Sequence, residues 1–382
     1  MKANILKMIG QAVEWKTVDE VVSTITAPTK VKKEVYKISG KIPIIDQGIE
    51  FIAGYTDEPL TPVKSDQYVI FGDHSEHIKF VDFAFIQGAD GLKILKPKYD
   101  NAKYIYHAFL NFYKKELSYK RHWTKAKETL IPIPPLSVQS QIVQILDTFT
   151  ELNDQLTAEL SMRQKQYQYY RDLLLSEHEL AKVGFEWKTL GEVVLPTNNI
   201  KWDESDLSYR YIDLSSVDKD NNNIGETLEI TSKNAPSRAQ KIVKKDDVIF
   251  ATTRPTQMRS ALIPPNLDGQ IASTGYCILR ANQNEVLPKW IYYNLQIDEF
   301  KIYLQGKQSG TAYPAISDGL IKQFKIPIPP LSVQSEIVAI LDTFDTLVNS
   351  ICEGLPKEIQ LRQKQYEYYR ERLLTFDAGD GV

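Results

Sequence analysis

The 382-residue chain has very little cysteine and no long apolar segment. Its cysteines are Cys277 and Cys352, which provide neither a disulfide framework nor a cysteine-rich zinc site. No apolar run approaches the roughly 20 residues that a membrane-spanning helix needs. Residues 1–17 also lack the apolar core of a signal peptide. These absences predict a cytoplasmic protein that has no membrane partner.

Sequence patterns for catalysis are also missing. Neither Gly-Lys pair of the chain has the upstream glycine and the following Ser or Thr of a phosphate-binding loop. A repeated Glu-Trp-Lys, at Glu14 and Glu186, resembles part of a metal-dependent nuclease site, but residues 1–13 supply no second carboxylate. His74 and His77 form a single His-x-x-His in a polar turn with no cysteine nearby, which is a poor metal motif. We therefore expect no catalytic residue, no metal and no cofactor.

The chain does contain one long segment that is written twice. Both copies begin Ile-Pro-Ile-Pro-Pro-Leu-Ser-Val-Gln-Ser, the first at Ile131 and the second at Ile326. After this lead-in, apolar residues recur at spacings of three and four, which predicts a long helix with a coiled-coil seam. The seam residues are Ile142, Ile145, Phe149, Leu152 and Leu156 in the first copy and Ile337, Ile340, Phe344, Leu347 and Ile351 in the second. The double proline predicts an extended entry, and Ser137 and Ser332 are suitable N-cap residues.

A shorter repeat precedes each copy of the long one. Glu-Trp-Lys-Thr occurs at Glu14 and again at Glu186, so the order is globular unit, helix, globular unit, helix. The sequences between the repeats differ strongly, and both indicate mixed α/β domains with short strands. Two equivalent helices in one chain predict a pseudo-two-fold axis, about which the helices pack antiparallel. Because the second helix alone contains Gly354 and Pro356, we expect a break or kink near them.

The predicted fold is therefore α+β, with two globular α/β domains separated by two long helices that pack as an antiparallel coiled coil. The first domain spans residues 1–130 and its helix 131–176, while the second domain spans 177–325 and its helix 326–382. The formal net charge is −3, and the acidic excess lies in the helical segments. This balance neither supports nor excludes a nucleic-acid partner, because a binder needs its cations on one face.

With these repeats the chain resembles the specificity subunits of type I restriction-modification systems. The likeness rests on the two lead-ins, on the Lys-Gln-Tyr-x-Tyr-Tyr-Arg of each helix, and on segments within both globular units. Those segments are residues 71–74, 88–91 and 120–123 of the first unit and 235–238, 251–255, 272–275 and 309–317 of the second. The resemblance implies a non-catalytic protein that reads a bipartite target in double-stranded DNA through two target-recognition domains. It also implies that two DNA methyltransferase (modification) subunits and a motor-nuclease (restriction) subunit dock on this scaffold.

Candidate DNA contacts are residues that can donate to phosphates or to base edges. In the second unit, a basic run precedes a strand that ends near Arg254, where arginine can fork onto guanine, and a small polar loop follows later. The residues selected there are Arg238, Lys241, Lys244, Lys245, Thr252, Thr253, Arg254, Arg259, Ser309, Thr311 and Tyr313. The alternative for the lysines is a solvated turn in which they lie next to acids. The residues selected in the first unit are His74, Lys79, Lys120, Arg121 and His122.

The ends of the two helices carry more tyrosines than one seam can use. Some rings should face the opposite helix, and the others either a partner protein or the chain's own domains. The candidate partner contacts are Tyr169, Tyr170 and Arg171 in the first helix and Tyr368, Tyr369 and Arg370 in the second. A protein–protein adaptor, whose two domains grip polypeptides, would also suit the acidic helices. A steep loss of duplex affinity with salt would distinguish DNA recognition from that alternative.

Overall fold

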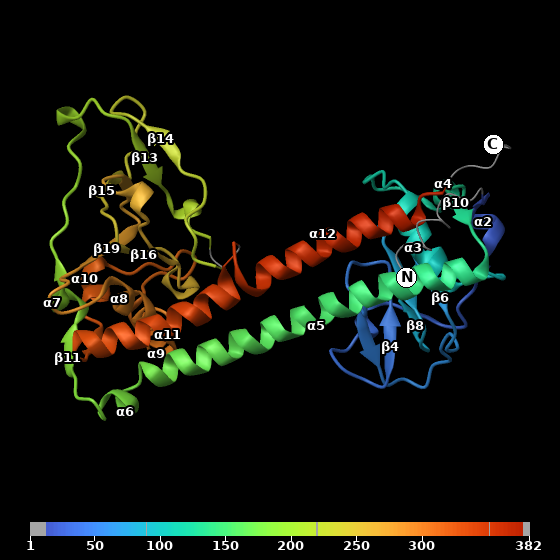
Figure 1. Ribbon diagram of the computed structural model, residues 1–382, viewed down its shortest axis with the longest axis horizontal. Helices are drawn as coiled ribbons and strands as arrows, with labels where there is room; N and C mark the ends of the chain where they lie inside the picture. Colours follow the sequence, from blue (N-terminus) through green and yellow to red (C-terminus); the bar gives the residue numbers. More distant parts are fainter. Residues whose placement is uncertain (1–12, 89, 219–220, 351, 377–382) are drawn as a thin grey trace. The chain divides into compact units, whose positions relative to one another are not determined.

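The computed structural model describes residues 13–376 except residues 89, 219–220 and 351. Ala89 and Ile351, which belong to two of the predicted segments, lie outside the described residues. The chain divides into two compact units: unit 1 is Met1–Gln155 with Gln360–Val382, and unit 2 is Leu156–Ile359. Each unit combines one globular domain with segments of the long helices (Figure 1).

The globular domain of unit 1 is built from short strands and a few helices. Its strands are β1 (Glu14–Thr17), β2 (Val22–Ile25), β3 (Lys30–Val31), β4 (Ile42–Ile45), β5 (Gly54–Thr56), β6 (Tyr68–Gly72), β7 (Ile78–Val81), β8 (Ile86–Gly88), β9 (Leu92–Pro97) and β10 (Leu130–Ile133). Its helices are α2 (Val18–Val21), α3 (Ala102–Phe112) and α4 (Trp123–Ala126).

Two four-stranded sheets form the body of this domain. One has the strand order β2-β9-β6-β7 and the other β3-β8-β4-β5. Ile45 of the second sheet packs with Ile70 and Ile94 of the first in a shared core. Side chains alternate along a strand, so the next residue of β6, Phe71, points to the opposite face and packs on Phe109 of α3, with ring centroids 5.6 Å apart. The first sheet therefore lies between the second sheet and α3.

The globular domain of unit 2 repeats this architecture. Its strands are β11 (Glu186–Thr189), β12 (Val194–Leu195), β13 (Tyr209–Ile212), β14 (Leu228–Ile230), β15 (Ala239–Ile242), β16 (Val248–Ala251), β17 (Ser260–Leu262), β18 (Ile271–Ser273), β19 (Tyr276–Ala281) and β20 (Lys325–Ile328). Its helices are α6 (Glu177–Leu180), α7 (Leu190–Val193), α8 (Pro288–Asn294), α9 (Asp298–Lys307) and α10 (Asp318–Lys322). The sheet β12-β19-β16-β17 corresponds to β2-β9-β6-β7, and β4 and β13 each have one antiparallel and one parallel neighbour. Interiors that look unrelated in sequence thus share most of their topology.

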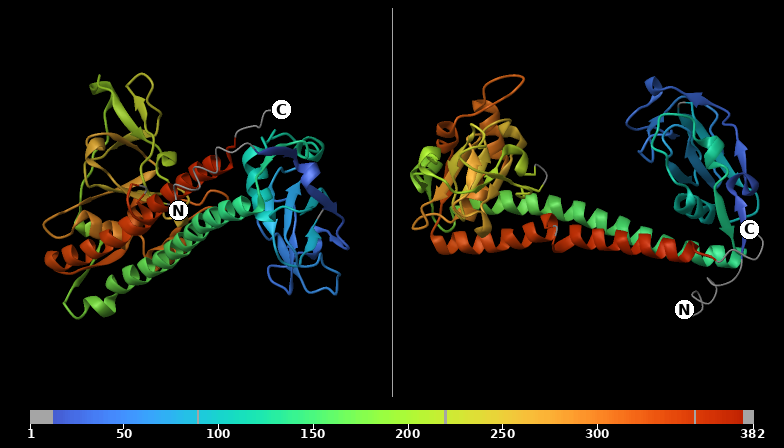
Figure 2. Two further views of the ribbon diagram at one scale, coloured as in Figure 1. Left: turned by 45° about the vertical axis from the view of Figure 1, so that its right-hand side comes forward. Right: turned by 90° about the horizontal axis from the view of Figure 1, so that it is seen from above.

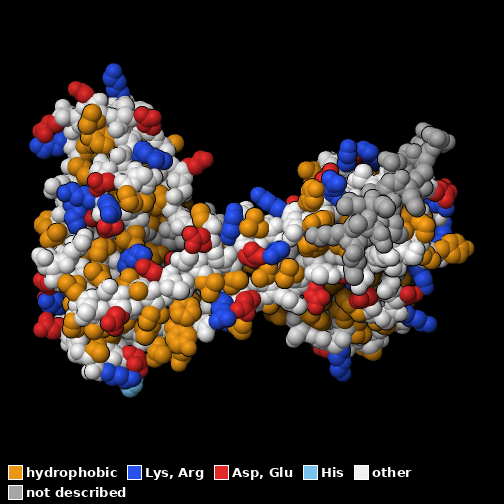
Figure 3. Space-filling view, viewed as in Figure 1, with side chains coloured by type: hydrophobic (Ala, Val, Ile, Leu, Met, Phe, Trp, Pro, Cys, Tyr) orange, Lys and Arg blue, Asp and Glu red, His pale blue; other side chains and the backbone are white. Residues whose placement is uncertain are grey.

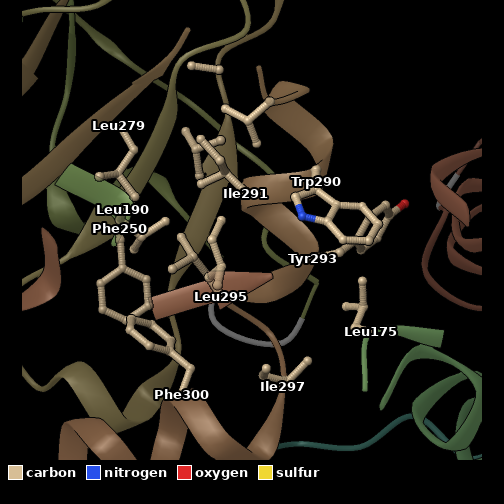
Figure 4. Close-up of a cluster of buried hydrophobic side chains, with 14 of the residues drawn as sticks. Leu175, Leu190, Phe250, Leu279, Trp290, Ile291, Tyr293, Leu295, Ile297 and Phe300 are labelled. Atoms are coloured by element: carbon tan, nitrogen blue, oxygen red, sulfur yellow. The ribbon is translucent and has the colours of Figure 1, made fainter. Parts of the chain in front are cut away.

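Large aromatic side chains fill the core of unit 2. Trp290 of α8 is fully buried, and Phe250 of β16 contacts Phe300 of α9 edge to face with ring centroids 5.2 Å apart. Figure 4 shows these rings among leucine and isoleucine side chains from strands and helices of the unit. Burial of such rings supplies much of the apolar area that stabilises a domain.

The long helices are α5 (Leu136–Leu174), α11 (Leu331–Asn349) and α12 (Gly354–Leu374). In unit 1, Phe149 stacks on Tyr369 at 5.3 Å between centroids, and the Asn153 side-chain amide donates to Gln363 at 3.0 Å. Because residue numbers rise along one helix as they fall along the other, α5 and α12 run antiparallel, as Figure 2 also shows. In unit 2 the same kind of stack joins α5 and α11, between Tyr170 and Phe344 at 5.6 Å.

The second long helix is interrupted where the sequence predicts it. Helix α11 ends at Asn349 and α12 begins at Gly354, which has a φ of +72°. A Cβ at that glycine would lie 2.5 Å from the Thr346 carbonyl oxygen, so the turn requires glycine. The predicted break is confirmed, and α5 has no such interruption.

The two short repeats pair with the two lead-ins. Strand β1 is antiparallel to β10, with Trp15 opposite Pro132, and β11 is antiparallel to β20, with Trp187 opposite Pro327. Each of these prolines also accepts a hydrogen bond at its carbonyl from the domain helix. The donor is the Tyr104 hydroxyl in unit 1, at 2.9 Å, and an indole N–H of α8 in unit 2, at 2.8 Å. The two repeated borders of each domain therefore pair with each other.

The start of each long helix is held by a buried glutamine. The Gln139 amide donates to the Pro134 carbonyl at 2.8 Å and accepts from the N–H of Asn101, the N-cap of α3, at 2.9 Å. Gln334 makes the same contacts in unit 2, with Pro329 and with the N-cap of α8, each at 2.9 Å. The prediction that Ser137 and Ser332 are N-caps is wrong, because the helices begin one residue earlier, at Leu136 and Leu331.

The buried face of the second helix also differs from the predicted seam. Ile340 is exposed, whereas Leu341 is fully buried, and Leu146 is its buried equivalent in α5. The reason is that this part of each helix packs on its own globular domain as well as on the other helix. Coiled-coil spacing predicts only the second of these contacts.

Replacing Gln139 with alanine should lower the free energy of unfolding of unit 1 by roughly 2–4 kcal/mol, because the half-buried Asn101 N–H and the buried Pro134 carbonyl would lose their partner. Urea unfolding followed by circular dichroism would measure the change. Gln144→Ala, at an exposed position of the same helix, is the control and should change stability by less than about 0.5 kcal/mol. Equal effects of the two substitutions would show that the strand pair alone sets the helix start.

Candidate nucleic-acid interface

Arg254 lies on the turn that leaves β16 in unit 2. Its φ of 51° is in the left-handed region, which is unfavourable for a residue with a Cβ. The Arg254 N–H donates to the Pro314 carbonyl at 2.7 Å, and Thr253 forms a β-bridge with Ala315, so two loops hold this conformation together. The guanidinium lies 5.4 Å from the centre of the Tyr313 ring, in a cation–π contact. Both side chains are exposed, and they present a planar cation and an aromatic ring to solvent.

The loop that carries Tyr313 is tight and polar. At its base, Ser309 and Ala315 exchange backbone hydrogen bonds of 2.9 Å. Gly310 has a φ of +91°, and a Cβ there would lie 3.0 Å from the Tyr313 carbonyl oxygen. Ser309 and Thr311 are exposed. The structure therefore brings these predicted residues to the same surface as the guanidinium.

Two other predicted contacts support the turn instead. The Thr252 side chain is buried, and its hydroxyl donates to the Gly275 carbonyl at 2.9 Å. Arg259 donates from Nη1 to the Leu214 carbonyl at 2.8 Å. These hydrogen bonds engage the Thr252 hydroxyl and Arg259 Nη1 within the fold, so both residues support the turn that carries Arg254. Thr253 is half-buried beside them.

The predicted basic run does not form one patch with Arg254. Lys241 is committed to the fold, because its ammonium donates to a backbone carbonyl and to the Asp318 carboxylate, both at 2.6 Å. Lys244 and Lys245 are exposed, but they precede β16 whereas Arg254 follows it. They consequently lie at the opposite end of that strand, beside acidic residues, as the alternative of a solvated turn expects.

Arg238 precedes β15 of the other sheet and is linked to the turn after β16 through the segment between β18 and β19. Its carbonyl accepts from the Thr274 N–H at 2.8 Å, and the next residue, Gly275, accepts from the Thr252 N–H at 2.8 Å. The Arg238 side chain is exposed. On the face of unit 2 seen in Figure 3, basic and acidic side chains are interspersed, and no single large basic patch stands out there.

In unit 1, two of the predicted contact residues are buried and do not lie on the surface. Lys79 is buried, and its ammonium donates to the carbonyls of Asp46 and Glu50 at 2.8 and 2.6 Å. Burial lowers the pKa of this lysine. His122 is also buried, with Nε2 2.7 Å from the Ser118 carbonyl oxygen. Because packing uses their polar groups, Lys79 and His122 are less suited to contact a phosphate than the exposed candidates of this unit.

The remaining three candidates of unit 1 share one loop surface. His74 Nδ1 lies 3.1 Å from the Lys120 carbonyl oxygen, and the imidazole stacks on Tyr119 with ring centroids 5.6 Å apart. The Lys120 ammonium pairs with Glu116 at 2.8 Å, and Arg121 is exposed. Tyr119 is not among the predicted contacts, although its position in a Ser-Tyr-Lys-Arg run, which joins an aromatic ring to cations, is a usable signal.

The tyrosines selected for partner contact separate into two kinds. Tyr170 and Tyr369 stack on phenylalanines of the opposite helix and belong to the helix seams. Tyr169 and Tyr368 are 63% and 54% exposed. Arg171 is buried beside Asp172, and Arg370 lies over a neighbouring tyrosine ring. The surface available to a partner thus includes one exposed tyrosine at equivalent positions of the two repeats.

No helix in the described part of the chain is long and apolar enough to cross a bilayer. The same residues include no group of three or more His, Cys, Asp or Glu side chains that could hold a metal ion.

A scan against protein-family models matches residues 12–162 and 182–361 to the type I restriction modification DNA specificity domain. The chain belongs to this family. It is a DNA specificity component of a type I restriction-modification system and not a catalytic subunit. The predicted recognition of DNA by a non-catalytic subunit is thereby confirmed, and the adaptor alternative is set aside.

Two curated relatives and one solved structure illustrate the match. The specificity subunit of the type I restriction enzyme EcoR124I/EcoR124II from Escherichia coli is 36% identical, over 98% of this chain and 96% of that protein. A putative type I restriction enzyme specificity subunit from Haemophilus influenzae is 31% identical over 96% of each protein. The crystal structure of the S subunit of a type I restriction-modification system from M. genitalium has a TM-score of 0.59 at 16% identity and covers 96% of this chain and 97% of that one. The last likeness supports the fold: two mixed domains and their long helices.

Replacing Arg254 with alanine should cost about 1–3 kcal/mol in binding at one half of the target, as the loss of a bidentate base contact does. The other half should still be read correctly. Sequencing the modified bases of cells that carry the variant would measure both halves. Arg210→Ala is the control, because Arg210 is exposed on β13 of the same unit and its guanidinium donates to the Thr227 hydroxyl at 2.8 Å. An unchanged modification pattern for Arg254→Ala would assign Arg254 a purely structural role.

Proposed function

We propose that each unit reads one half of a bipartite, asymmetric DNA target, and that the two target-recognition domains lie within residues 1–130 and 177–325. The observation that supports this most directly is a shared frame with different exposed groups. Asp73 follows β6 and Thr252 follows β16, and each N–H donates to a glycine carbonyl at the start of the neighbouring strand, at 2.6 and 2.8 Å. Beyond these equivalent points the exposed side chains differ. Two domains that share a topology but expose different side chains are expected to bind two different half-site sequences.

In unit 2, Arg254 is the proposed base-reading residue. A guanidinium has donors in a fixed fork that matches the two acceptors on the major-groove edge of guanine. The left-handed turn and the Tyr313 ring restrict its orientation before DNA arrives, so less side-chain freedom is lost on binding. The exposed hydroxyls of Ser309 and Thr311 are proposed to contact the backbone or the minor groove, and Arg238 a phosphate.

In unit 1, the proposed contacts are His74, Lys120 and Arg121. Lys120 and Arg121 lie on the loop that follows α3, and His74 lies on the turn after β6. The His122 N–H donates to the Asp73 carbonyl at 2.8 Å and joins the two segments. This is the same end of the sheet that carries Arg254 in unit 2. We therefore assign the two half-sites to equivalent edges of the two domains.

The repeated helices are proposed to hold two methyltransferase subunits, one for each repeat, in addition to a restriction subunit. Tyr169 and Tyr368 support this number, because they are exposed at equivalent positions while their neighbours Tyr170 and Tyr369 are used in the seams. Since its target is chromosomal and invading DNA, the complex is proposed to act in the cytoplasm.

Duplex binding across a range of salt concentrations tests the DNA reading. The chain co-purified with its methyltransferase should show a linear fall of log affinity against log salt, with a slope of about −0.9 for each phosphate contacted. Fluorescence anisotropy with a labelled duplex that carries the host's modified sequence would measure it. A flat response would contradict phosphate contacts and favour a protein ligand for the two domains.

Replacing both Tyr169 and Tyr368 with glutamate should abolish or strongly reduce co-purification of the methyltransferase, because a charge would be placed in each proposed contact. Circular dichroism should show an unchanged fold, since both side chains are exposed. Phenylalanine at the same two positions keeps the rings and should leave assembly intact. Undiminished assembly of the glutamate variant would place the methyltransferase contacts elsewhere.

A further inference from the structure

A loop of unit 1 holds two large side chains out in solvent. It spans residues 113–122, between α3 and α4, and is called here the finger loop. On it, Leu117 is 86% exposed and Tyr119 is 93% exposed. A single exposed apolar side chain is common on protein surfaces. The finger loop differs from an ordinary surface loop because buried polar groups fix its shape.

Glu76 anchors the finger loop from below. Its buried carboxylate accepts from the Tyr113 hydroxyl at 2.6 Å and from the N–H groups of Glu116 and Leu117, both at 2.8 Å. Burial by itself would raise the pKa of this carboxyl, but these hydrogen bonds and the nearby His122 outweigh burial and lower the pKa. A charged group therefore sits under the loop, where only such donors make its burial tolerable.

The backbone of the finger loop is held in a conformation that the chain does not favour. Leu117 has a φ of +55°, in the left-handed region that leucine rarely adopts. The buried His122 closes the loop, with Nε2 2.7 Å from the Ser118 carbonyl oxygen. A strained residue that the surrounding contacts keep in place is typical of functional sites. Here the strain presents Leu117 and Tyr119 to solvent.

Cations surround this exposed tip. Glu116, the acid of the loop, is paired with Lys120 and Lys125 at 2.8 and 2.6 Å, and these lysines lower its pKa to about 2. The other cations of the loop are exposed and form no ion pair with any described residue; they are Lys114, Lys115 and Arg121. An apolar tip with unpaired cations on either side is complementary to DNA, in which the bases of a step lie between two phosphates.

The loop that carries Tyr313 has the corresponding place in unit 2. It is bonded to the end of β16 through the Ile316 N–H, which donates to the Thr252 carbonyl at 2.9 Å, as the finger loop is bonded to the residue after β6. Tyr119 stacks on His74 at an interplanar angle of 21°, and Tyr313 lies beside the guanidinium of the neighbouring turn. Each unit therefore presents an exposed tyrosine against a planar side chain at the same edge, although the two loops share no sequence pattern.

We propose that Tyr119 and Leu117 are the base-contacting tip of unit 1. Tyr119 stacks on a base of the half-site, and Leu117 packs as an apolar wedge at the adjacent base step. Aromatic rings stack on bases, and apolar side chains inserted from the minor groove unstack a step. The assignment rests on the proposed function, because it names the residues with which unit 1 reads its half of the target. The free lysines and Arg121 bind the flanking phosphates.

The test compares Tyr119→Ala with Tyr99→Ala in the full chain co-purified with its methyltransferase. Tyr99 is 88% exposed in the same unit but lies outside the finger loop, so it is a matched control. Each complex selects duplexes from a library with randomised positions, and the bound duplexes are sequenced. Tyr119→Ala should lose base preference in one half of the selected motif and bind the wild-type motif roughly 10- to 100-fold more weakly. Tyr99→Ala should select the wild-type motif.

Two further variants make the outcomes distinct. Arg254→Ala should reduce base preference in the opposite half of the motif. If Tyr119→Ala reduces preference in the same half as Arg254→Ala, or in neither half, the assignment is wrong. Tyr119→Phe keeps the ring and should bind like the wild type, whereas a loss equal to that of Tyr119→Ala would exclude stacking. If the Tyr119→Ala complex selects the same motif as the wild type, the assignment of the finger loop is wrong but the proposed function stands. A wild-type complex that selects no motif defeats the proposed function itself. Equal thermal unfolding midpoints would show that each variant is folded.

Discussion

The hydrogen bonds of two buried glutamines, Gln139 and Gln334, fix how each domain meets its long helix. Each amide joins the carbonyl of the first proline of the Pro-Pro pair to the N-cap N–H of the domain helix, so both helices start from one bonded point. An ion pair between the domain helix and the long helix, Lys103 with Asp147, adds to this contact, and unit 2 has its equivalent. A buried amide without these partners would be costly. The position of every surface loop relative to its own helix segment follows from this arrangement.

We call this glutamine-centred contact between a domain and its long helix the joint. Away from the joint, the two domains use different chemistry to present one exposed tyrosine each. Unit 1 holds its exposed tyrosine with a buried carboxylate, Glu76, whereas unit 2 uses Gly310 and backbone bridges. In both, the tyrosine lies against a planar side chain, His74 or Arg254. The sheets supply the stable frame, and the loops at one edge carry the side chains that differ. Such a division lets the recognition surface vary while the core packing remains the same.

Much of the fold follows from repeats and spacing alone, including the two long helices, their antiparallel packing and the break at Gly354. The surroundings of single residues cannot be predicted from repeats and spacing. Lys79 looks like a surface cation because the carbonyls that bury it come from a loop far away in the sequence. Gln139 looks like an exposed helical residue for the same reason. The neighbouring cations mark Tyr119 as a possible contact, but its fixed exposure depends on Glu76, which lies about 40 residues away in the sequence.

The joint also has a consequence for how such proteins change over generations. Its neighbourhood is built from both ends of each domain: Trp15 and Trp187 lie in the strands that pair with the two proline lead-ins. The same short sequence stands at equivalent borders of both domains, so genetic recombination at those borders would replace a domain and leave its attachment intact. One crossover would then give a chain that reads a new half-site, with no compensating mutation in the helices. With duplicated borders, a new specificity can arise by exchange of a whole domain and does not require gradual mutation of its surface.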